Sequence, residues 1–313
     1  MLVECAGVGV NYADCVVRMG LYSSAKEFVG WPITPGFEFA GRVAQVGAGV
    51  TDVAVGDEVL GVMRFGAYAS HVVVPSAQLF ARPSTMSAQA ASAFPVAALT
   101  AWYALHELGA VRSGQTILVH SAAGGVGGTL VQLGRIAGCT VVGVVGHSSK
   151  VDAARQLGAT HVIDKSSEDL WTVAKKHAPK GFDIVLDANG VETLGKSYAH
   201  MAPEGRLIVY GFHTMLSKTG RRNWLALAWN FLRTPRFNAI DMTNTNRSVL
   251  AFNLSYLFER TDFLRSALTE LLALQESGQL QTPTLTTYPL ERVADAHRDL
   301  ESARTIGKLV LEP

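Results

Sequence analysis

The chain has 313 residues, of which 48% are hydrophobic and 17% are charged, and 30 of them are glycine. This length accommodates two packed domains, and this composition is typical of a globular protein rather than a disordered one. Lys and Arg total 27 against 26 Asp and Glu, so the net charge is only +1. Nucleic-acid binding usually depends on a clear excess of basic residues, so this charge balance argues against a nucleic-acid-binding protein.

The cysteines and the apolar runs indicate the compartment. Cys5, Cys15 and Cys139 are too few for a disulfide framework or a four-thiolate zinc site. The sequence shows neither a signal peptide nor an apolar run long enough to span a membrane. We therefore expect a reducing, cytoplasmic location.

Short β-rich segments with frequent turns make up the first part of the chain, to about residue 93. Strand-like runs occupy residues 38–46, 58–63 and 67–74. Such segments predict a small, partly open β-barrel.

From about residue 112 the pattern changes to apolar strands that alternate with helices. The strands are predicted at 116–120, 140–145, 161–164, 183–187 and 206–210. This alternation predicts right-handed βαβ units and a parallel, doubly wound sheet. A last strand near 309–311 predicts that the chain returns to the first domain. The expected domains are 1–93, 94–280 and the returning segment 281–313.

A glycine-rich turn follows the first strand of the predicted parallel sheet. Residues 122–127 read Ala-Ala-Gly-Gly-Val-Gly, which is G-x-G-x-x-G with alanine at the first glycine. Small residues between a strand and a helix let the backbone approach a pyrophosphate, which the helix N-terminus stabilises. The turn therefore predicts dinucleotide binding at Ala123, Gly124, Gly125, Val126 and Gly127. The alternative is an incidental glycine-rich turn.

The end of the second parallel strand bears on the choice of nucleotide. NAD-selective sites place Asp or Glu here to bind the ribose 2′-hydroxyl, whereas this chain has Gly146, His147, Ser148, Ser149 and Lys150. Two hydroxyls and a cation favour the 2′-phosphate of NADP. Alternatively, Ser148 or Ser149 is a helix N-cap and Lys150 is solvated.

Residues 190–197 match the phosphate-loop pattern G-x-x-x-x-G-K-[ST]. A functional loop of this kind is rich in glycine so that its amides surround the phosphates, but here Glu192 and branched residues occupy the interior. We interpret the segment as the start of a helix, with nucleoside triphosphate binding as a less favoured alternative.

Motifs spread over the whole chain resemble zeta-crystallin-type quinone oxidoreductases, which are zinc-independent members of the medium-chain dehydrogenase/reductase superfamily. Two further stretches, at 220–228 and 246–257, are similar to its VAT-1 branch. The general motifs lie at residues 10–14 (VNYAD), 35–41 (PGFEFAG), 55–59 (VGDEV), 99–103 (LTAWY), 114–135 and 307–310 (GKLV).

The resemblance implies a Rossmann domain and a GroES-like catalytic domain that is formed from both ends of the chain. Zinc relatives have a Cys ligand where this chain has Asn11, and a His ligand where it has Phe37. The cysteine-rich lobe that holds a structural zinc is also missing. Because Asn and Phe supply neither thiolate nor imidazole, we expect no metal.

The resemblance also implies the site residues and the reaction. The residues expected to take part in catalysis are Asn11, Asp14, Tyr22 and Thr100. The further residues expected to contact the nucleotide are Tyr103, Tyr210, Gly211, Phe252, Asn253 and Leu254. Asn11 and Tyr22 are candidates to donate hydrogen bonds to a developing oxyanion. The alternatives are that Asn11 and Asp14 cap a turn and a helix, and that Tyr22 is only packed.

Without a Lewis acid, the favoured reaction is NADPH-dependent reduction of quinones or α,β-unsaturated carbonyls, because the charge gained on reduction delocalises onto oxygen. The aromatic stretch 224–233, preceded by Arg221 and Arg222, suggests a second hypothesis, a lipid-binding or membrane-associated protein that keeps the cofactor fold. The same stretch fits a lid, or burial against the protein core or a dimer partner. A strand near 249–254 is a candidate for pairing in a homodimer.

Set against the family, residues 1–4 fall on an inner strand, and the hairpin that normally precedes this strand is absent from the sequence. We expect either a mis-assigned start or a small domain that lacks its first strands and exposes an unpaired edge.

Overall fold

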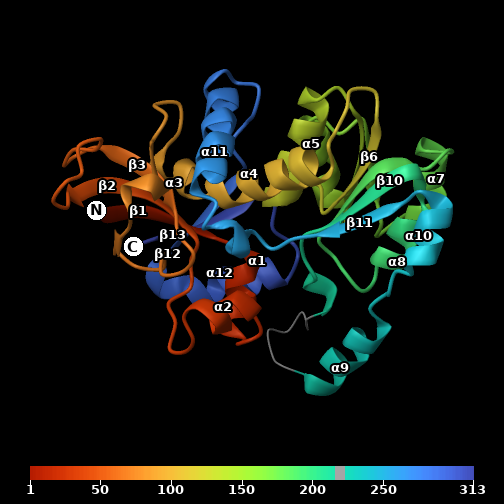
Figure 1. Ribbon diagram of the computed structural model, residues 1–313, viewed down its shortest axis with the longest axis horizontal. Helices are drawn as coiled ribbons and strands as arrows, with labels where there is room; N and C mark the ends of the chain where they lie inside the picture. Colours follow the sequence, from red (N-terminus) through yellow and green to blue (C-terminus); the bar gives the residue numbers. More distant parts are fainter. Residues whose placement is uncertain (216–222) are drawn as a thin grey trace. The chain divides into compact units, whose positions relative to one another are not determined.

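The computed structural model describes residues 1–215 and 223–313, and the chain divides into two compact units (Figure 1). Unit 1 comprises Met1–Leu99 and Leu254–Pro313, and unit 2 comprises Thr100–Asn253. Residues 94–99 and 254–280 therefore group with unit 1, whereas the sequence predicts that both belong to the nucleotide-binding domain.

Helix α11 (Thr261–Glu276) accounts for this grouping. The Gln275 side chain accepts a hydrogen bond of 2.8 Å from the hydroxyl of Thr85. At its other end, the Arg265 guanidinium lies 5.0 Å from the centre of the Phe80 ring. Both partners belong to the N-terminal part of unit 1, and no local pattern in the sequence indicates them.

Unit 1 is built on a seven-stranded sheet in which both ends of the chain take part. The order is β12-β13-β1-β2-β3-β5, with β4 also paired to β1. The pairing of β13 with β1 is antiparallel, so the predicted return of the chain is confirmed. The strands are β1 (Leu2–Val10), β2 (Glu38–Gln45), β3 (Glu58–Val62), β4 (His71–Val73), β5 (Leu79–Ala81), β12 (Leu285–Pro289) and β13 (Lys308–Glu312).

Apolar side chains of these strands form one core, with Val3, Val8, Phe39 and Leu311 fully buried. Alternating burial along the first half of β1 follows from the two-residue period of a strand. Its last residues are buried without interruption. The other helices with residues in this unit are α1 (Tyr12–Arg18), α2 (Ser23–Phe28), α3 (Ala88–Ser92), α4 (Pro95–Trp102) and α12 (Val293–Glu301).

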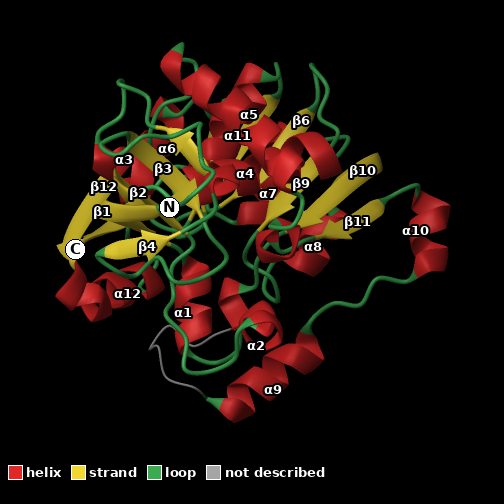
Figure 2. Cartoon of the chain, turned by 60° about the vertical axis from the view of Figure 1, so that its left-hand side comes forward, coloured by secondary structure: helices red, strands yellow, loops and turns green. Residues whose placement is uncertain are grey.

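Unit 2 is a parallel six-stranded sheet with the order β11-β10-β9-β6-β7-β8. Figure 2 shows its strands with helices packed on them. The strands are β6 (Thr116–His120), β7 (Thr140–Val145), β8 (His161–Asp164), β9 (Phe182–Asp187), β10 (Met201–Val209) and β11 (Ser248–Ala251). From β6 the chain adds β7 and β8 on one side, and it then adds β9, β10 and β11 on the other side. The switch point of the sheet therefore lies between β6 and β9, and ligands of such sheets bind there, outside the carboxyl ends of the strands.

The three strands β6, β7 and β8, which come first along the chain, have the predicted bounds. β10 begins at Met201, earlier than expected, because a register shift lets the segment before Arg206 continue the pairing with β9. β11 ends at Ala251 rather than near 254. The helices are α5 (Gly125–Ile136), α6 (Val151–Gln156), α7 (Leu170–His177), α8 (Leu194–Ala199), α9 (Trp224–Arg233) and α10 (Ala239–Thr245).

Helix α9 has the predicted bounds, but none of its residues is buried. Both views show it apart from the sheet of unit 2 (Figures 1 and 2). Burial against the protein's own core, one of the expected alternatives, is therefore not observed. Arg221 and Arg222, its predicted basic flank, lie outside the described residues. Within 1–215 and 223–313, no helix is long and apolar enough to cross a bilayer.

Candidate functional site

The glycine-rich turn connects β6 to α5 at the switch point of the sheet. Ser121 has a φ of +57°, and its carbonyl oxygen accepts the Gly124 amide at 2.9 Å. A Cβ on Gly127 would lie 2.1 Å from this same oxygen, whereas a Cβ on Gly124 would lie 3.3 Å from it. Only glycine therefore fits at 127, and the close approach brings the first turn of α5 against the end of β6. The amides of that first turn have no partner inside the helix and are suited to an anion.

The loop after β7 is held by a carboxylate of the neighbouring strand. Ser148 donates a hydrogen bond of 2.5 Å to Asp164, the last residue of β8. Hydrogen bonds from Ser148 and Ser166 lower the pKa of Asp164 to about 2, so the carboxylate is ionised at neutral pH. The Ser148 hydroxyl therefore donates its hydrogen bond to Asp164. This contact could not be predicted from the sequence, because the two residues lie at the ends of different strands.

The same loop begins the short 3₁₀ helix Ser148–Lys150, and its N-cap is His147. The His147 ring accepts the backbone amide of Ser149 at 3.3 Å, so the alternative of a serine N-cap is not observed. Lys150 is half-buried, and burial lowers its pKa.

The phosphate-loop pattern at residues 190–197 does not form an anion site. One carboxylate oxygen of Asp187, at the end of β9, accepts the backbone amides of Asn189 and Gly190 at 2.8 and 3.2 Å. The other accepts the hydroxyl of Ser197 at 2.9 Å. A carboxylate thus occupies the place where a phosphate would have to bind, and the helical interpretation holds from Leu194 onward.

A buried histidine belongs to the same cluster. His120 lies with Nε2 3.1 Å from the Ser197 hydroxyl and 3.7 Å from Asp187. Burial lowers the pKa of His120, which favours the neutral ring. The cluster connects to the glycine-rich turn, because Ser121 donates to the Asn189 side chain at 3.2 Å. These contacts connect the loops that follow β6 and β9.

Three of the predicted nucleotide-contacting residues come together as an aromatic group in unit 2. The Phe252 ring lies 4.8 Å from Tyr103 and 6.4 Å from Tyr210, between ring centres. The Tyr210 hydroxyl is buried and has no hydrogen-bond partner among the described residues. Burial, with a smaller contribution from Asp187, raises its pKa. A buried phenol without a partner is costly, and a bound ligand would supply one.

Gly211 and Asn253 complete the predicted nucleotide set in unit 2. A Cβ on Gly211 would lie 3.0 Å from the carbonyl oxygen of Ala188, so the loops after β9 and β10 approach closely there. Leu254, by contrast, is buried in unit 1, where it begins the 3₁₀ helix Leu254–Leu257.

A polar network surrounds Asn11 in unit 1. The Lys308 ammonium donates to Glu38 and to the Asn11 side-chain oxygen at 2.7 Å each, and to the Val10 carbonyl at 2.9 Å. The Asn11 side-chain amide donates to Glu38 at 2.8 Å, and the second Glu38 oxygen accepts the Val96 amide at 2.7 Å. Glu38 and Lys308 are buried, whereas Asn11 is half-buried. Glu38 and Lys308 are not among the predicted site residues. In the sequence, Glu38 is a single acidic residue in an apolar strand and Lys308 is the lysine of the GKLV motif.

Asp14 is fully buried, and its two carboxylate oxygens accept the amides of Asn11 and Gly36 at 2.8 Å each. Burial raises its pKa to about 7. This geometry is that of a residue that caps α1 and fixes a neighbouring loop. It favours the capping interpretation over the catalytic role predicted for Asp14.

Tyr22 precedes α2, and its ring packs edge-on against Phe37 and Phe65 at 5.9 and 6.3 Å between ring centres. Thr100 is buried in α4 and belongs to unit 2. Of the four predicted catalytic residues, Asn11, Asp14 and Tyr22 belong to unit 1, and Thr100 belongs to unit 2.

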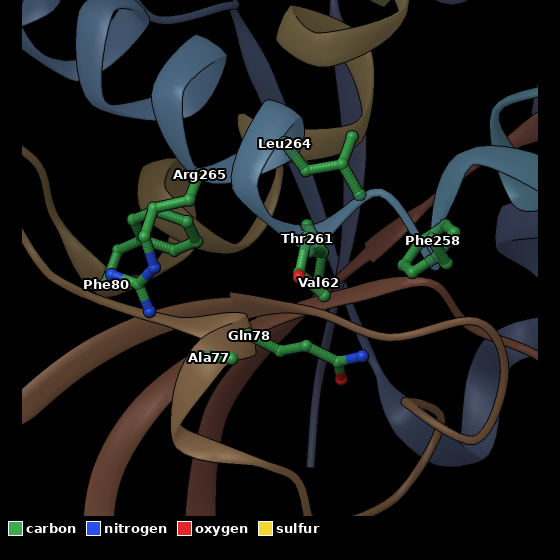
Figure 3. Close-up of a pocket in the computed structure, with 8 residues that line it drawn as sticks. All are labelled: Val62, Ala77, Gln78, Phe80, Phe258, Thr261, Leu264 and Arg265. Carbon is green, nitrogen blue, oxygen red and sulfur yellow. The ribbon is translucent and has the colours of Figure 1, made fainter.

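A small hollow in unit 1 contains none of the predicted site residues (Figure 3). It lies between the strands β3 and β5 and the start of α11, and the Arg265 guanidinium stands beside the Phe80 ring there. Its lining is mostly apolar, with Gln78 and Thr261 as further polar side chains. It offers no cluster of groups for the expected chemistry.

Comparisons with known proteins agree with this architecture. Residues 1–84 match the alcohol dehydrogenase GroES-like domain family, and residues 157–311 match the zinc-binding dehydrogenase family. The synaptic vesicle membrane protein VAT-1 homolog of Rattus norvegicus is 37% identical over 306 residues, which cover 97% of this chain and 74% of that protein. The chain belongs to the VAT-1 branch of the medium-chain dehydrogenase/reductase family.

Solved structures extend this family relationship to enzymes. The Escherichia coli quinone oxidoreductase complexed with NADPH matches with a TM-score of 0.85 and 28% identity, covering 100% of this chain and 91% of that one. The human VAT-1 homolog-like protein matches with a TM-score of 0.83 and 27% identity, covering 100% and 88%. The fold is a Rossmann-like domain combined with a GroES-like domain, as predicted.

One matched family is named for zinc, but the residues of this VAT-1 relative do not fit the metal. Asn11 lies among Lys308 and Glu38, whose ion pair is already complete, and Phe37 is packed in an aromatic cluster. Across the described parts of the chain, no three His, Cys, Asp or Glu side chains gather in a metal-binding group. No step of the chemistry below is assigned to zinc.

Proposed function

We propose that this VAT-1 relative is a cytoplasmic, zinc-independent NADPH-dependent oxidoreductase that reduces quinones or α,β-unsaturated carbonyls. The observation that carries the proposal is the glycine-rich turn at the switch point of unit 2, where Gly127 admits no side chain. Bound NADPH supplies a hydride from its nicotinamide. The amides at the start of α5 bind the pyrophosphate, and the Tyr210 hydroxyl gains a partner from the bound nucleotide.

The preference for NADPH rests on the loop after β7. Residues 146–150 themselves contain no carboxylate, but the Ser148 hydroxyl already donates to the ionised Asp164. The proposed preference for the 2′-phosphate therefore depends on the cation of Lys150. We expect Lys150→Ala to weaken NADPH binding about tenfold, equal to about 1.4 kcal/mol, and to leave NADH binding unchanged. Equal affinities of the unaltered protein for both nucleotides would remove the NADP assignment.

Asn11 is the proposed hydrogen-bond donor to the substrate oxygen. Its half-buried amide uses one hydrogen for Glu38, and the second is left for an oxygen on which negative charge develops. Tyr22 and Thr100 are proposed as substrate contacts, and Asp14 as a positioning residue that holds the backbone of Asn11.

The test is NADPH consumption with a panel of quinones, enones and enoyl thioesters, with product identification. We expect turnover with at least one class, and a loss of about 100-fold in kcat for Asn11→Ala, as for removal of one oxyanion donor. Lys180 is exposed, and Lys180→Met serves as a control that should leave turnover unchanged. Binding of NADPH without turnover of any class would contradict the proposal.

A second candidate activity is contact with an anionic membrane surface through α9. Trp224, Trp229 and Leu232 are 61%, 61% and 69% exposed, and no acidic residue occurs from 223 to 240, whereas Arg233 and Arg236 do. Exposed aromatic side chains beside cations are typical of helices that lie in a membrane interface. We expect binding to vesicles containing phosphatidylserine, lost in Trp224→Ala/Trp229→Ala. Unchanged sedimentation of that variant with vesicles would exclude this role for α9.

We also propose that the protein is a homodimer. In the described residues β11 is an edge strand, paired only with β10, and such an edge is available to a second copy. Sedimentation analysis that finds only monomer at micromolar concentration would exclude the dimer.

A further inference from the structure

We infer that the buried ion pair of Lys308 and Glu38 fixes the orientation of the Asn11 amide, so that both are positioning residues for reduction. This inference rests on the proposed function, since it concerns the same substrate-oxygen donor. Neither residue touches the substrate in this account. They act through Asn11.

The orientation follows from the chemistry of the three groups. An ammonium only donates hydrogen bonds, and an ionised carboxylate only accepts them. The Asn11 oxygen must therefore face Lys308, at 2.7 Å, and the Asn11 nitrogen must face Glu38, at 2.8 Å. A flipped amide would set donor against donor and oxygen against oxygen, with both charged groups buried, which is a costly arrangement.

The ion pair itself has no freedom to rearrange. Three hydrogen bonds leave Lys308, which matches the number of hydrogens on an ammonium. The side chains of Lys308 and Glu38 are 5% and 0% exposed. On Gly9 an added Cβ would lie 2.4 Å from a Glu38 oxygen. The absence of a side chain at Gly9 is therefore what admits the carboxylate.

Three separate elements hold the network in place. Asn11 joins β1 to α1, Glu38 begins β2, and Lys308 begins β13. The ammonium also withdraws electron density from the Asn11 amide, which strengthens its remaining N–H as a donor. The consequence is an oxyanion donor that is oriented before substrate binds.

The test is the double variant Lys308→Met/Glu38→Gln, which removes both charges together, because removal of one would leave the other buried and unpaired. We expect NADPH affinity within about twofold of the unaltered protein and a kcat lower by about 10- to 100-fold. In this background Asn11→Ala should cause little further loss, whereas alone it lowers kcat about 100-fold. Equal effects of Asn11→Ala in both backgrounds, or an unchanged kcat of the double variant, would overturn the inference.

Two further measurements separate this inference from the proposed function and from misfolding. The ¹⁵N-labelled side-chain amide of Asn11 should shift in the double variant and not in Lys180→Met, whether or not any substrate is turned over. An unshifted amide signal would overturn the inference even if the enzyme is active. Lys308→Arg, which keeps the charge and the donors, should retain more turnover than the double variant Lys308→Met/Glu38→Gln. Equal loss in these two variants would also count against it.

Discussion

Replacing Gly127 by alanine would place a methyl group 2.1 Å from the carbonyl oxygen of Ser121 and 2.7 Å from its carbonyl carbon. Both atoms belong to the backbone, so no side-chain rotation can relieve the overlap. Either α5 or the end of β6 has to move. Overpacking of this kind typically destabilises a protein by about 1–3 kcal/mol, and here it would also displace the amides proposed to bind the pyrophosphate.

Gly124→Ala is the matched control, since its methyl group would meet only the same Ser121 oxygen, at 3.3 Å. With a φ of −86°, alanine needs no left-handed backbone conformation, and the Ser121 carbonyl has to move by only a few tenths of an ångström. The loss of stability should therefore stay below about 1 kcal/mol. Gly124 nevertheless matches the second glycine of the fingerprint, at which the backbone is expected to approach the nucleotide. The affinity for NADPH should therefore fall at least about tenfold, or about 1.4 kcal/mol.

Urea unfolding and NADPH titration of both variants measure these two effects separately. Gly127→Ala should lose stability together with affinity, and Gly124→Ala should lose affinity alone. If Gly127→Ala unfolds like the unaltered protein, the close approach of α5 to β6 is refuted. If Gly124→Ala binds NADPH normally, the assignment of the turn as the pyrophosphate site is refuted.

Further expectations concern titration and thiol access. Burial raises the pKa of Asp14 from its usual 3.8 to about 7. The folded state therefore holds this proton more tightly than the unfolded chain, and the resulting stabilisation is lost as the pH rises from about 4 to about 7. The stability difference between the unaltered protein and Asp14→Asn, measured by urea unfolding, should decline over that range. Parallel profiles would contradict it. Burial, with a smaller contribution from Arg18, lowers the pKa of His297 from 6.5 to about 4. The free energy of unfolding should therefore fall as the pH is lowered from 6.5 to about 4. His297→Gln should lose less of this free energy over the same pH range. Of the thiols, half-buried Cys139 should react with a disulfide reagent before Cys5 and Cys15, which are buried; simultaneous reaction in the folded protein would contradict their burial.

The parallel sheet could be predicted because its signals are local. The runs at 116–120 and 140–145 are mainly apolar, and the shorter run at 161–164 has Val162 and Ile163 at its centre. A buried parallel strand of this kind needs no partner information to be recognised. Its glycine-rich turn is equally local. Hence the observed bounds of β6, β7 and β8 coincide with the predicted ones.

The network around Asn11 could not be predicted in the same way. Lys308 is 297 residues from Asn11 and 270 from Glu38, and only the pairing of β13 with β1 brings them together. The bond between Ser148 and Asp164 depends in the same way on two strands lying side by side. The apolar pattern of residues 224–233 predicts α9 correctly. Such a pattern does not indicate which surface covers the helix, and none of its residues is buried in the structure.

The most direct test of hydride transfer by this protein uses NADPH deuterated at both C4 positions and an enone substrate. We predict one deuterium per product molecule, at the carbon β to the carbonyl, with loss of the label from the nicotinamide in equal amount. Product without deuterium, or NADPH that stays bound and unoxidised with every quinone and enone supplied, would contradict the assignment as an NADPH-dependent reductase.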